Sequence, residues 1–286
     1  MTPGHRAFAS EEVEVQTPHA LTKLLALARP LVMGILNITP DSFSDGGHFV
    51  DPATAISHAE DMIMAGADIL DVGGESTRPY GAVPISAEEE WARVGPVLSR
   101  IVTLGVPISI DTMKATVADR ALAAGAAVVN DVWGLQRDPE MARVAAKRNA
   151  GLIIVHNRTA VDPAIDIIND IHAFFARSLA LADDAGMPRE RIVLDPGIGF
   201  GKTPEQSIQA IARLTSLKDF GLPLLIGLSR KRFIASIGAS EPNQRLGGSI
   251  AGNLMAAQAG AAILRVHDVA ETVQALRLAT AIEEAR

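Results

Sequence analysis

Eight apolar segments of strand length alternate with helical segments along this chain, and the alternation predicts a single (β/α)8 barrel. The chain has 286 residues, which suits one large barrel, and no linker rich in Pro, Gly or Ser divides it. Hydrophobic residues make up 48% and aromatic residues only 4%, so the core must be built from Ala, Val, Ile and Leu. An open doubly wound sheet is the alternative, and it is disfavoured because no GxGxxG turn follows the first strand.

The expected strands and helices follow one another in strict order after residue 30. The strands are expected at residues 31–37, 68–72, 107–111, 126–131, 151–156, 191–195, 223–228 and 261–266. The helices are expected at residues 53–65, 86–104, 114–124, 138–149, 164–186, 204–218, 244–259 and 269–284. Small-residue joints that contain Gly precede four strands, at residues 65–67, 124–126, 150–151 and 259–261, and Gly just past a helix supplies a left-handed cap.

The first 28 residues differ from the rest of the chain. They begin polar and then include a short amphipathic piece, ALTKLLALA. We expect an N-terminal extension at 1–28, either outside the core or as a helix across one end, followed by the barrel at 29–286. The opening residues lack the apolar stretch of a signal peptide, and no apolar run is long enough to span a bilayer.

Composition also limits the classes of molecule that the protein is expected to bind. The formal net charge of −7 argues against general nucleic-acid binding, so an anionic ligand must be held by local cations. The chain has no Cys, which excludes disulfides and thiolate chemistry and is consistent with a reducing cytosol. We therefore expect a cytoplasmic protein that acts on small molecules, with no nucleic-acid or membrane partner.

Polar side chains stand at the carboxyl ends of the predicted strands, where the catalytic groups of barrels lie. The richest segment reads LVMGILNITPDSFSDGG over residues 31–47, a strand that runs into a polar loop. Asp111 alone could cap the following helix, and His156 alone could be a satisfied core histidine. A charged or amide group at every strand end on one rim is better explained by an active site.

These polar residues fall into two chemical sets. The donors and cations are Arg78, Lys202, Arg230, Lys231, Arg265 and His267. The oxygen-rich set is Asn37, Asp71, Asp111, Asn130, Asp131 and Asp195. The first set suits phosphate, and the second suits either the amino edge of a heterocycle or a hard cation such as Mg²⁺. Together they indicate a planar, nitrogen-rich substrate with a phosphorylated tail.

Several long motifs then carry a resemblance to a known family. They read NITPDSFSDGG, DVGGESTRP, IDT at 110–112, VNDV at 129–132, DPGIGFGKT at 195–203, GLSRKRF at 227–233 and RVHDV at 265–269. In this order and spacing they resemble the dihydropteroate synthases, pterin-binding barrel enzymes of folate biosynthesis, over roughly residues 31–280. The resemblance implies a transferase that condenses 6-hydroxymethyl-7,8-dihydropterin pyrophosphate with 4-aminobenzoate, with loss of pyrophosphate through a pterin cation. It also implies Mg²⁺ as cofactor and a homodimer, for which the apolar C-terminal helices at 249–262 and 270–282 are the expected contact.

The same resemblance implies a role for each matching position. The catalytic residues would be Asp111, Arg265, His267 and Asn37. The pterin would be bound by Asp111, Asn130, Asp195, Lys231 and Gly227, and the pyrophosphate by Asn37, Arg78, Arg265 and His267. The 4-aminobenzoate would be bound by Thr77, Arg78, Pro79, Phe200, Lys231 and Arg232, and Asn37 would contact the metal. The loops around 41–45 and 76–80 would close over the site.

Three positions depart from the family pattern, and two other functions are possible readings. Asn157 replaces a common Met, Tyr80 is added to the second loop, and Arg232 stands where some members have Ser. A pterin-dependent methyltransferase on the same barrel would not need SFSDGG, STRP or the pair Arg265 and His267. A non-catalytic pterin-binding paralogue is the other alternative, and the intact polar set speaks against it.

Overall fold

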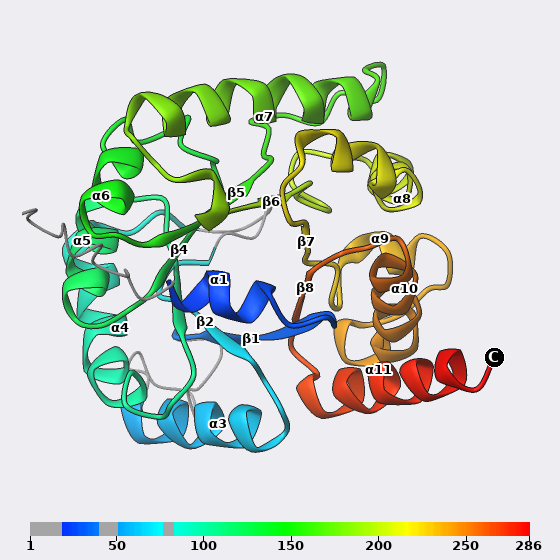
Figure 1. Cartoon of the computed structure of the whole chain (residues 1–286), viewed down its shortest axis with the longest axis horizontal. Coiled ribbons are helices and arrows are strands. Elements are labelled where there is room, and N and C mark those ends of the chain that lie inside the picture. The colour runs from blue at the N-terminus through cyan, green and yellow to red at the C-terminus, as the bar shows by residue number, and fades with distance from the viewer. Residues whose placement is uncertain (1–18, 40–50, 77–82) are drawn as a thin grey trace, which may run out of the picture.

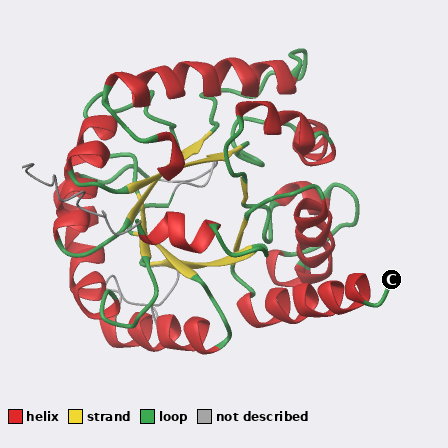
Figure 2. Ribbon diagram, in the orientation of Figure 1, coloured by secondary structure: helices red, strands yellow, loops and turns green. Residues whose placement is uncertain are grey.

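The chain folds into a ring of eight parallel strands surrounded by helices, which confirms the predicted (β/α)8 barrel (Figures 1 and 2). The computed structural model describes residues 19–39, 51–76 and 83–286. The strands are β1 (Leu31–Asn37), β2 (Ile69–Gly73), β3 (Ile108–Asp111), β4 (Val128–Asp131), β5 (Gly151–Val155), β6 (Ile192–Asp195), β7 (Leu225–Ile226) and β8 (Ile263–Val266). Their order in the sheet is β6-β5-β4-β3-β2-β1-β8-β7.

The ring closes between β6 and β7. A single parallel bridge joins Leu194 to Leu224, and the N–H of Leu194 donates to the carbonyl of Pro223 at 2.9 Å. The strand predicted at 223–228 is reduced to Leu225–Ile226, because Pro223 has no N–H to donate and the chain turns away after Ile226. The shortened strand leaves Gly227 and the turn after it at the rim of the barrel.

Helices cover the outside of the ring between successive strands. They are α3 (Pro52–Met64), α4 (Ala87–Ile101), α5 (Ala115–Ala123), α6 (Met141–Lys147), α7 (Ile167–Asp184), α8 (Pro204–Ala212), α9 (Arg232–Ala235), α10 (Leu246–Gln258) and α11 (Val269–Glu284), and a further helix, α1 (Ala20–Leu25), precedes β1. Three short 3-10 helices lie at Arg189–Arg191, Leu214–Phe220 and Pro242–Gln244. Within the described residues, no helix is long and apolar enough to cross a membrane.

Local sequence explains where these helices begin. The side chains of Asp51, Ser86, Asp166 and Thr203 accept hydrogen bonds from backbone N–H groups of the first helical turn. The helix predicted at 204–218 is interrupted after Ala212 and continues as the 3-10 helix Leu214–Phe220. The short helix α9 was not predicted.

Three of the four predicted joints contain a left-handed Gly, and the fourth differs. Gly66, Gly125 and Gly260 have φ values of 101°, 109° and 94°. At the fourth joint Asn149, with φ of 58°, takes the left-handed conformation instead of Gly151. Gly151 lies inside β5, where a Cβ atom would come within 2.7 Å of a methyl group of Leu21.

That contact belongs to the helix α1, which closes the amino-terminal end of the barrel (Figure 1). Leu21 is fully buried and packs in one cluster with inward-facing residues of the strands, among them Leu31, Met33, Ile153 and Ile263. Of the two predictions for residues 20–28, the helix across one end of the barrel is therefore the one observed. A second and larger apolar cluster fills the layer between the sheet and the outer helices.

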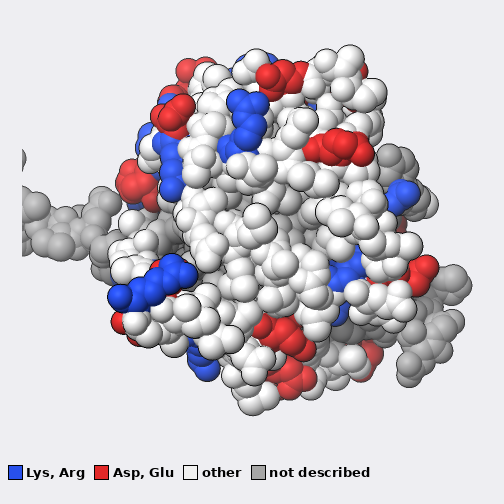
Figure 3. Space-filling model, turned by 90° about the vertical axis from the view of Figure 1, so that its right-hand side faces the viewer, with Lys and Arg blue, Asp and Glu red and all other residues white. Residues whose placement is uncertain are grey.

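One side of the molecule carries few charges. This side bears α10 and α11 and is drawn largely white in Figure 3. Met255 on α10 and Leu278 and Ile282 on α11 are exposed there by 64%, 62% and 52%. Large apolar side chains at such exposure mark a surface suited to contact with another protein.

Candidate active site

The two-residue period of the strands decides which polar side chains face the interior of the barrel. Asp71, Asp111, Asn130 and Asp195 continue the inward-facing rows of their strands and are buried at the carboxyl-terminal end. Asp131 is the next residue after Asn130 and takes the opposite face. Its carboxylate accepts from the N–H groups of Trp133 and Leu135, at 2.9 and 2.7 Å, and so fixes the turn after β4. Placing Asp131 among the site oxygens was therefore wrong.

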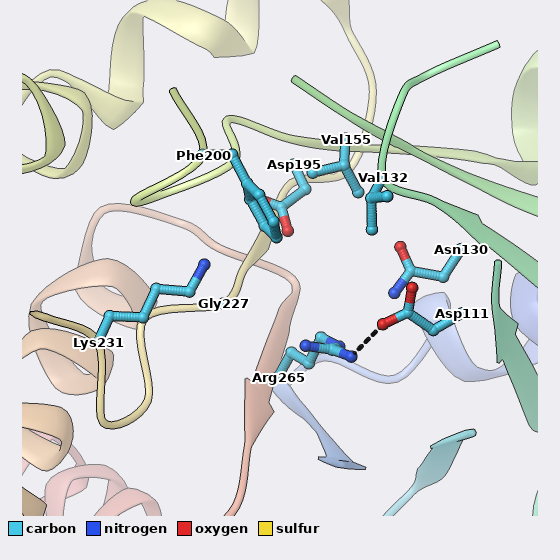
Figure 4. A pocket seen from close by; sticks show the side chains of 9 residues that line it. All are labelled: Asp111, Asn130, Val132, Val155, Asp195, Phe200, Gly227, Lys231 and Arg265. Atoms are coloured by element: carbon cyan, nitrogen blue, oxygen red, sulfur yellow. Dashed lines mark hydrogen bonds and ion pairs between the residues drawn. The ribbon is translucent and has the colours of Figure 1, made fainter. Parts of the chain in front are cut away.

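The inward-facing groups line a pocket at this end of the barrel (Figure 4). The residues that line it are Asp111, Asn130, Val132, Val155, Asp195, Phe200, Gly227, Lys231 and Arg265. Asp111 and Asn130 lie on one side of this pocket and Lys231 on the opposite side, whereas Arg265 is paired directly with Asp111. Gly227 belongs to the wall, and a Cβ atom there would meet Asp195 Oδ2 at 3.7 Å. Pterin-site residues predicted at the ends of four different strands, β3, β4, β6 and β7, are thus brought together.

Arg265 is held at the floor of the pocket by two carboxylates. Its Nε donates to Asp71 Oδ2 and its Nη2 donates to Asp111 Oδ2, both at 2.6 Å. Burial opposes the charge of Arg265, but Asp71 and Asp111 outweigh burial and raise its pKa above the ordinary value. The guanidinium is therefore a permanent cation with a fixed orientation.

Asp71 also orients the amide of Asn130. Asn130 Nδ2 donates to Asp71 Oδ2 at 2.9 Å, so the amide oxygen points the other way. Among the described residues, Asn130 Oδ1 and Asp111 Oδ1 are buried and have no hydrogen-bond partner. Two buried acceptors without donors are expected to receive them from a ligand.

The protonation of the pocket follows from its burial. Burial raises the pKa of Asp111 to about 7, with Arg265 opposing the rise and Asp71 adding to it. Burial likewise raises the pKa of Asp195 above its ordinary value, against the effect of Lys231. Burial lowers the pKa of Lys231 to about 8, although Asp195 favours its charged form. Perturbed groups of opposite sign in one pocket are typical of active sites.

The loop after β6 forms the wall beside Asp195. The N–H of Gly197 donates to Asp195 Oδ1 at 2.7 Å, which orients the carboxylate. Lys231 donates to the carbonyl of Ile198, and its Nζ lies 4.5 Å from the centre of the Phe200 ring. Phe200 is half-buried, so it lies nearer the rim than Asp111 or Asp195.

A second polar group lies at the ends of β7 and β8. The N–H and Nδ1 of His267 lie 3.2 and 3.1 Å from Ser229 Oγ. Arg230 has φ of 57° and pairs with Asp268. Burial lowers the pKa of His267 to about 4, and Arg265 and Arg230 add to the effect. His267 is therefore neutral near pH 7 in this structure.

The remaining predicted residues either do not line the pocket or lie outside the described residues. Asn37 ends β1 and is half-buried on the inward-facing row. Arg232 is exposed at the first residue of α9 and is not among the side chains that line the pocket. Asn157 does not line it either, and its Oδ1 accepts from the N–H of Arg158. Thr77, Arg78, Pro79 and Tyr80, together with the loop residues 41–45, lie outside the described residues.

The sequence reasoning missed two residues of the pocket wall and the role of a third residue. Asp71 was grouped with the oxygen ligands, but its role as the common partner of Arg265 and Asn130 was not predicted. Val132 and Val155 complete the wall of the pocket. The inward alternation of the strands could have revealed Asp71 and Val155, since both occupy inward positions at strand ends.

Comparison with known proteins agrees with this geometry. Residues 33–267 match the family described as pterin binding enzyme. The dihydropteroate synthase of Bacillus subtilis is 44% identical over 271 residues, covering 93% of this chain and 94% of its own. Two structures of the Xanthomonas albilineans dihydropteroate synthase, one with 4-aminobenzoic acid and one with 7,8-dihydropteroate, give TM-scores of 0.86 and 0.82. They are 43% and 41% identical, and each comparison covers 90% of this chain and 94% of the other.

A barrel with a buried pocket of opposed carboxylates and cations defines a small-molecule enzyme, and the chain belongs to the pterin-binding enzyme family. Its predicted activity, that of a dihydropteroate synthase, and its predicted class, a transferase, are confirmed by these relatives.

Proposed function

We propose that the pocket binds 6-hydroxymethyl-7,8-dihydropterin pyrophosphate and joins it to 4-aminobenzoate, giving 7,8-dihydropteroate and pyrophosphate. One observation carries the proposal: the buried acceptors of Asp111, Asn130 and Asp195 line one pocket together with the cations Lys231 and Arg265. A pterin ring offers amino and ring N–H donors on one edge and acceptors on another. The alternation of acceptor and donor walls matches such a ring.

Asp195 and Asn130 are proposed to bind the pterin edge. Asp195 Oδ1 already accepts from Gly197, so Oδ2 is the oxygen left for the ligand. Asn130 is fixed by Asp71 with its Oδ1 toward the ligand. Lys231 donates from the side of the Phe200 ring.

The reaction breaks the bond between the pterin methylene carbon and the pyrophosphate oxygen, and the electron pair leaves with pyrophosphate. The amine nitrogen of 4-aminobenzoate then bonds to the methylene carbon and loses a proton to solvent. The methylene carries positive charge between the two events, and the buried carboxylate of Asp111 is placed to stabilise that charge. Arg265 holds Asp111 in its orientation at 2.6 Å.

The leaving group is proposed to meet the ends of β1 and β8. Arg265 and His267 stand there, and Asn37 ends the adjacent strand. His267, whose pKa burial lowers to about 4, can donate one hydrogen bond as a neutral ring, while Arg265 supplies the charge. Arg78 is predicted to join them, and it lies outside the described residues.

A magnesium ion fits this arrangement only together with the substrate. No group of three or more His, Asp or Glu side chains that could hold a metal is found in the described part of the chain. Mg²⁺ commonly takes most of its oxygen ligands from substrate phosphates and water. Asn37 would supply one oxygen, and the bound ion would neutralise charge on the leaving pyrophosphate.

The arylamine is proposed to lie beside Phe200 and Lys231, toward the rim of the pocket. Phe200 offers a flat apolar face, and Lys231 lies over that ring. Thr77, Arg78, Pro79 and Arg232 stay predicted contacts of the 4-aminobenzoate.

We propose that two copies of the chain associate through α10 and α11. Support comes from the exposed Met255, Leu278 and Ile282 on a face with few charges (Figure 3). Homodimeric interfaces are more apolar than the rest of a protein surface. A cytoplasmic location stays a prediction from the sequence.

The decisive experiment measures pyrophosphate release from the purified protein with the pterin pyrophosphate and Mg²⁺, with and without 4-aminobenzoate. Release that depends on 4-aminobenzoate and accompanies formation of 7,8-dihydropteroate is the expected result. Tight pterin binding without product would contradict the proposal and would indicate a non-catalytic pterin-binding protein.

A further inference from the structure

A buried lysine lies beneath the loop that follows β6. Lys202 is only 6% exposed, and its Nζ lies 2.6 Å from His156 Nδ1, 2.8 Å from the carbonyl of Gly197 and 3.2 Å from that of Phe200. These three contacts use all the donors that an ammonium group has. Lys202 does not line the pocket, so the chemistry described above leaves it without a role.

The partners of His156 fix the direction of its hydrogen bonds. His156 Nε2 lies 2.9 Å from Asp170 Oδ2, and Arg158 pairs with the same carboxylate oxygen at 2.8 Å. An ion-paired carboxylate accepts, so Nε2 carries the ring hydrogen and Nδ1 accepts from Lys202. Burial lowers the pKa of His156 to about 3, with Lys202 adding to the effect, which agrees with a neutral ring.

The group therefore forms a chain of polar contacts from Arg158 through Asp170 and His156 to Lys202. Asp170 lies in the first turn of α7, and His156 follows β5. The loop after β6 is thus tied to the neighbouring unit of the barrel, formed by β5 and α7. Gly197 is pressed against the backbone of His156 so closely that a Cβ atom would lie 1.8 Å from the His156 carbonyl oxygen.

The peptide groups that Lys202 holds belong to residues that shape the pocket. Gly197 accepts from Lys202 through its carbonyl and donates through its N–H to Asp195 Oδ1 at 2.7 Å. Phe200 accepts from Lys202 through its carbonyl and presents its ring to the pocket. On the other side of the loop, Lys231 donates to the carbonyl of Ile198. The two lysines thus hold carbonyl groups of the same loop: Lys202 holds those of Gly197 and Phe200, and Lys231, from the pocket, holds that of Ile198.

We infer that Lys202 is a positioning residue, which sets the Phe200 ring and the Asp195 carboxylate through the loop carbonyls it holds, with His156 and Asp170 keeping the lysine in place. It acts on the binding of both substrates and touches neither. The inference rests on the proposed function, since it assigns Phe200 to the arylamine and Asp195 to the pterin.

The test compares Lys202→Met with Lys218→Met in the full-length enzyme. Methionine keeps the length and apolar stem of lysine but donates no hydrogen bond, and Lys218 is an exposed lysine for the same change. For Lys202→Met we expect the KM for 4-aminobenzoate to rise about tenfold and pterin binding to weaken, since a lost hydrogen bond is worth about one decade of affinity. We expect kcat at saturation to stay within about threefold, because the ion pairs of Asp111 and Arg265 do not involve the loop. Lys218→Met should leave every value unchanged.

An unchanged KM and an unchanged pterin affinity in folded Lys202→Met would overturn the inference, even if the melting temperature fell. A loss of kcat with an unchanged KM would also overturn it, because Lys202 would then act in the chemical step. Wild-type protein without condensing activity would instead remove the proposed function, so the two failures are distinguishable.

Two further measurements keep the inference testable if Lys202→Met does not fold. Asp170→Asn removes the charge of the half-buried carboxylate that holds His156, and it should raise the KM for 4-aminobenzoate by a smaller factor than Lys202→Met. An unchanged KM would count against the inference. The ¹⁵N chemical shifts of His156 should report the Nε2–H tautomer between pH 6 and 8, whereas an Nδ1–H tautomer would show that Lys202 does not donate to it.

Discussion

At the scale of single residues, the proposed mechanism depends most on Asp111. Its carboxylate is buried, paired on one oxygen with Arg265 and without a partner on the other among the described residues. In Asp111→Asn the shape is kept and the negative charge is lost. We expect kcat to fall by about 100-fold or more, since removing one group that stabilises developing charge commonly costs that much. Pterin binding, measured by titration calorimetry, should persist.

Asp131 provides the matched control, because it has the same side chain at the end of the adjacent strand but faces outward. Asp131→Asn should lower the melting temperature, since its carboxylate accepts two backbone N–H bonds, and should leave kcat unchanged. Near-normal turnover in Asp111→Asn would remove Asp111 from the mechanism.

The pH dependence of activity should carry the signature of the same carboxyl group. Asp111 must be negatively charged to stabilise the cation, and its pKa is raised to about 7. The ratio kcat/KM should therefore fall as the pH drops below about 7 and approach a plateau above it. Lys231, with its pKa lowered to about 8, should produce a separate decline on the alkaline side. In Asp111→Asn the acid limb should vanish and the alkaline limb remain; an acid limb of unchanged midpoint would assign it to another group.

At the scale of elements, α1 contributes stability at the end of the barrel opposite to the pocket. Leu21 is fully buried against Gly151 and the inward-facing strand residues. We expect Leu21→Ala to lower the free energy of unfolding by about 2–4 kcal/mol, the usual cost of removing a buried leucine side chain. Substrate KM values should not change, because stability and catalysis occupy opposite faces of such barrels.

The contact can be isolated with a second substitution in a double-mutant cycle. Gly151→Ala should destabilise the wild type, because its methyl group would lie 2.7 Å from Leu21, and should cost less in the Leu21→Ala background. Denaturant unfolding of the four proteins measures this coupling. Additive effects would show that the helix and the strand do not press on each other there.

The strands were the most predictable elements, and the reasons are local. β1 and the helix α11 were predicted to the residue, because Val, Ile and Leu runs and helical periodicity are read over short windows. The shortened β7 was not predicted, because its length depends on how the barrel closes between Leu194 and Leu224. The left-handed cap at Asn149 was placed at Gly151 instead, since glycine is the usual residue there.

The candidate site was predictable in its members but not in its pairings. A polar residue at a strand end is visible in the sequence, and Asp111, Asn130, Asp195, Lys231 and Arg265 do meet in one pocket. The pairing of Arg265 with Asp71 joins residues 194 positions apart in sequence, and only the closed barrel brings them together. The network of Lys202, His156 and Asp170 was missed for the same reason.

At the scale of the whole molecule, the face with few charges over α10 and α11 predicts association. Leu278→Arg places a charge on the proposed interface, and we expect it to convert a dimer into a monomer in sedimentation equilibrium. Exposed Leu181 on α7, across the barrel from α11 (Figure 1), gives the control, since Leu181→Arg should leave the mass unchanged. A wild-type protein of monomer mass at all concentrations would contradict the proposed homodimer.

Because α1 closes the amino-terminal end of the barrel, it affects the order in which the proposed substrates bind and the product leaves. Leu21 and its neighbours fill the barrel on the amino-terminal side of the pocket. In the described part of the molecule the pocket is therefore closed at that end and does not continue as a channel. The binding groups for the pterin are buried, whereas Phe200 stands nearer the entrance. An arylamine seated beside Phe200 would block the way in, so the deeper substrate must arrive first. The 7,8-dihydropteroate must then leave through the same opening, with its 4-aminobenzoate end first.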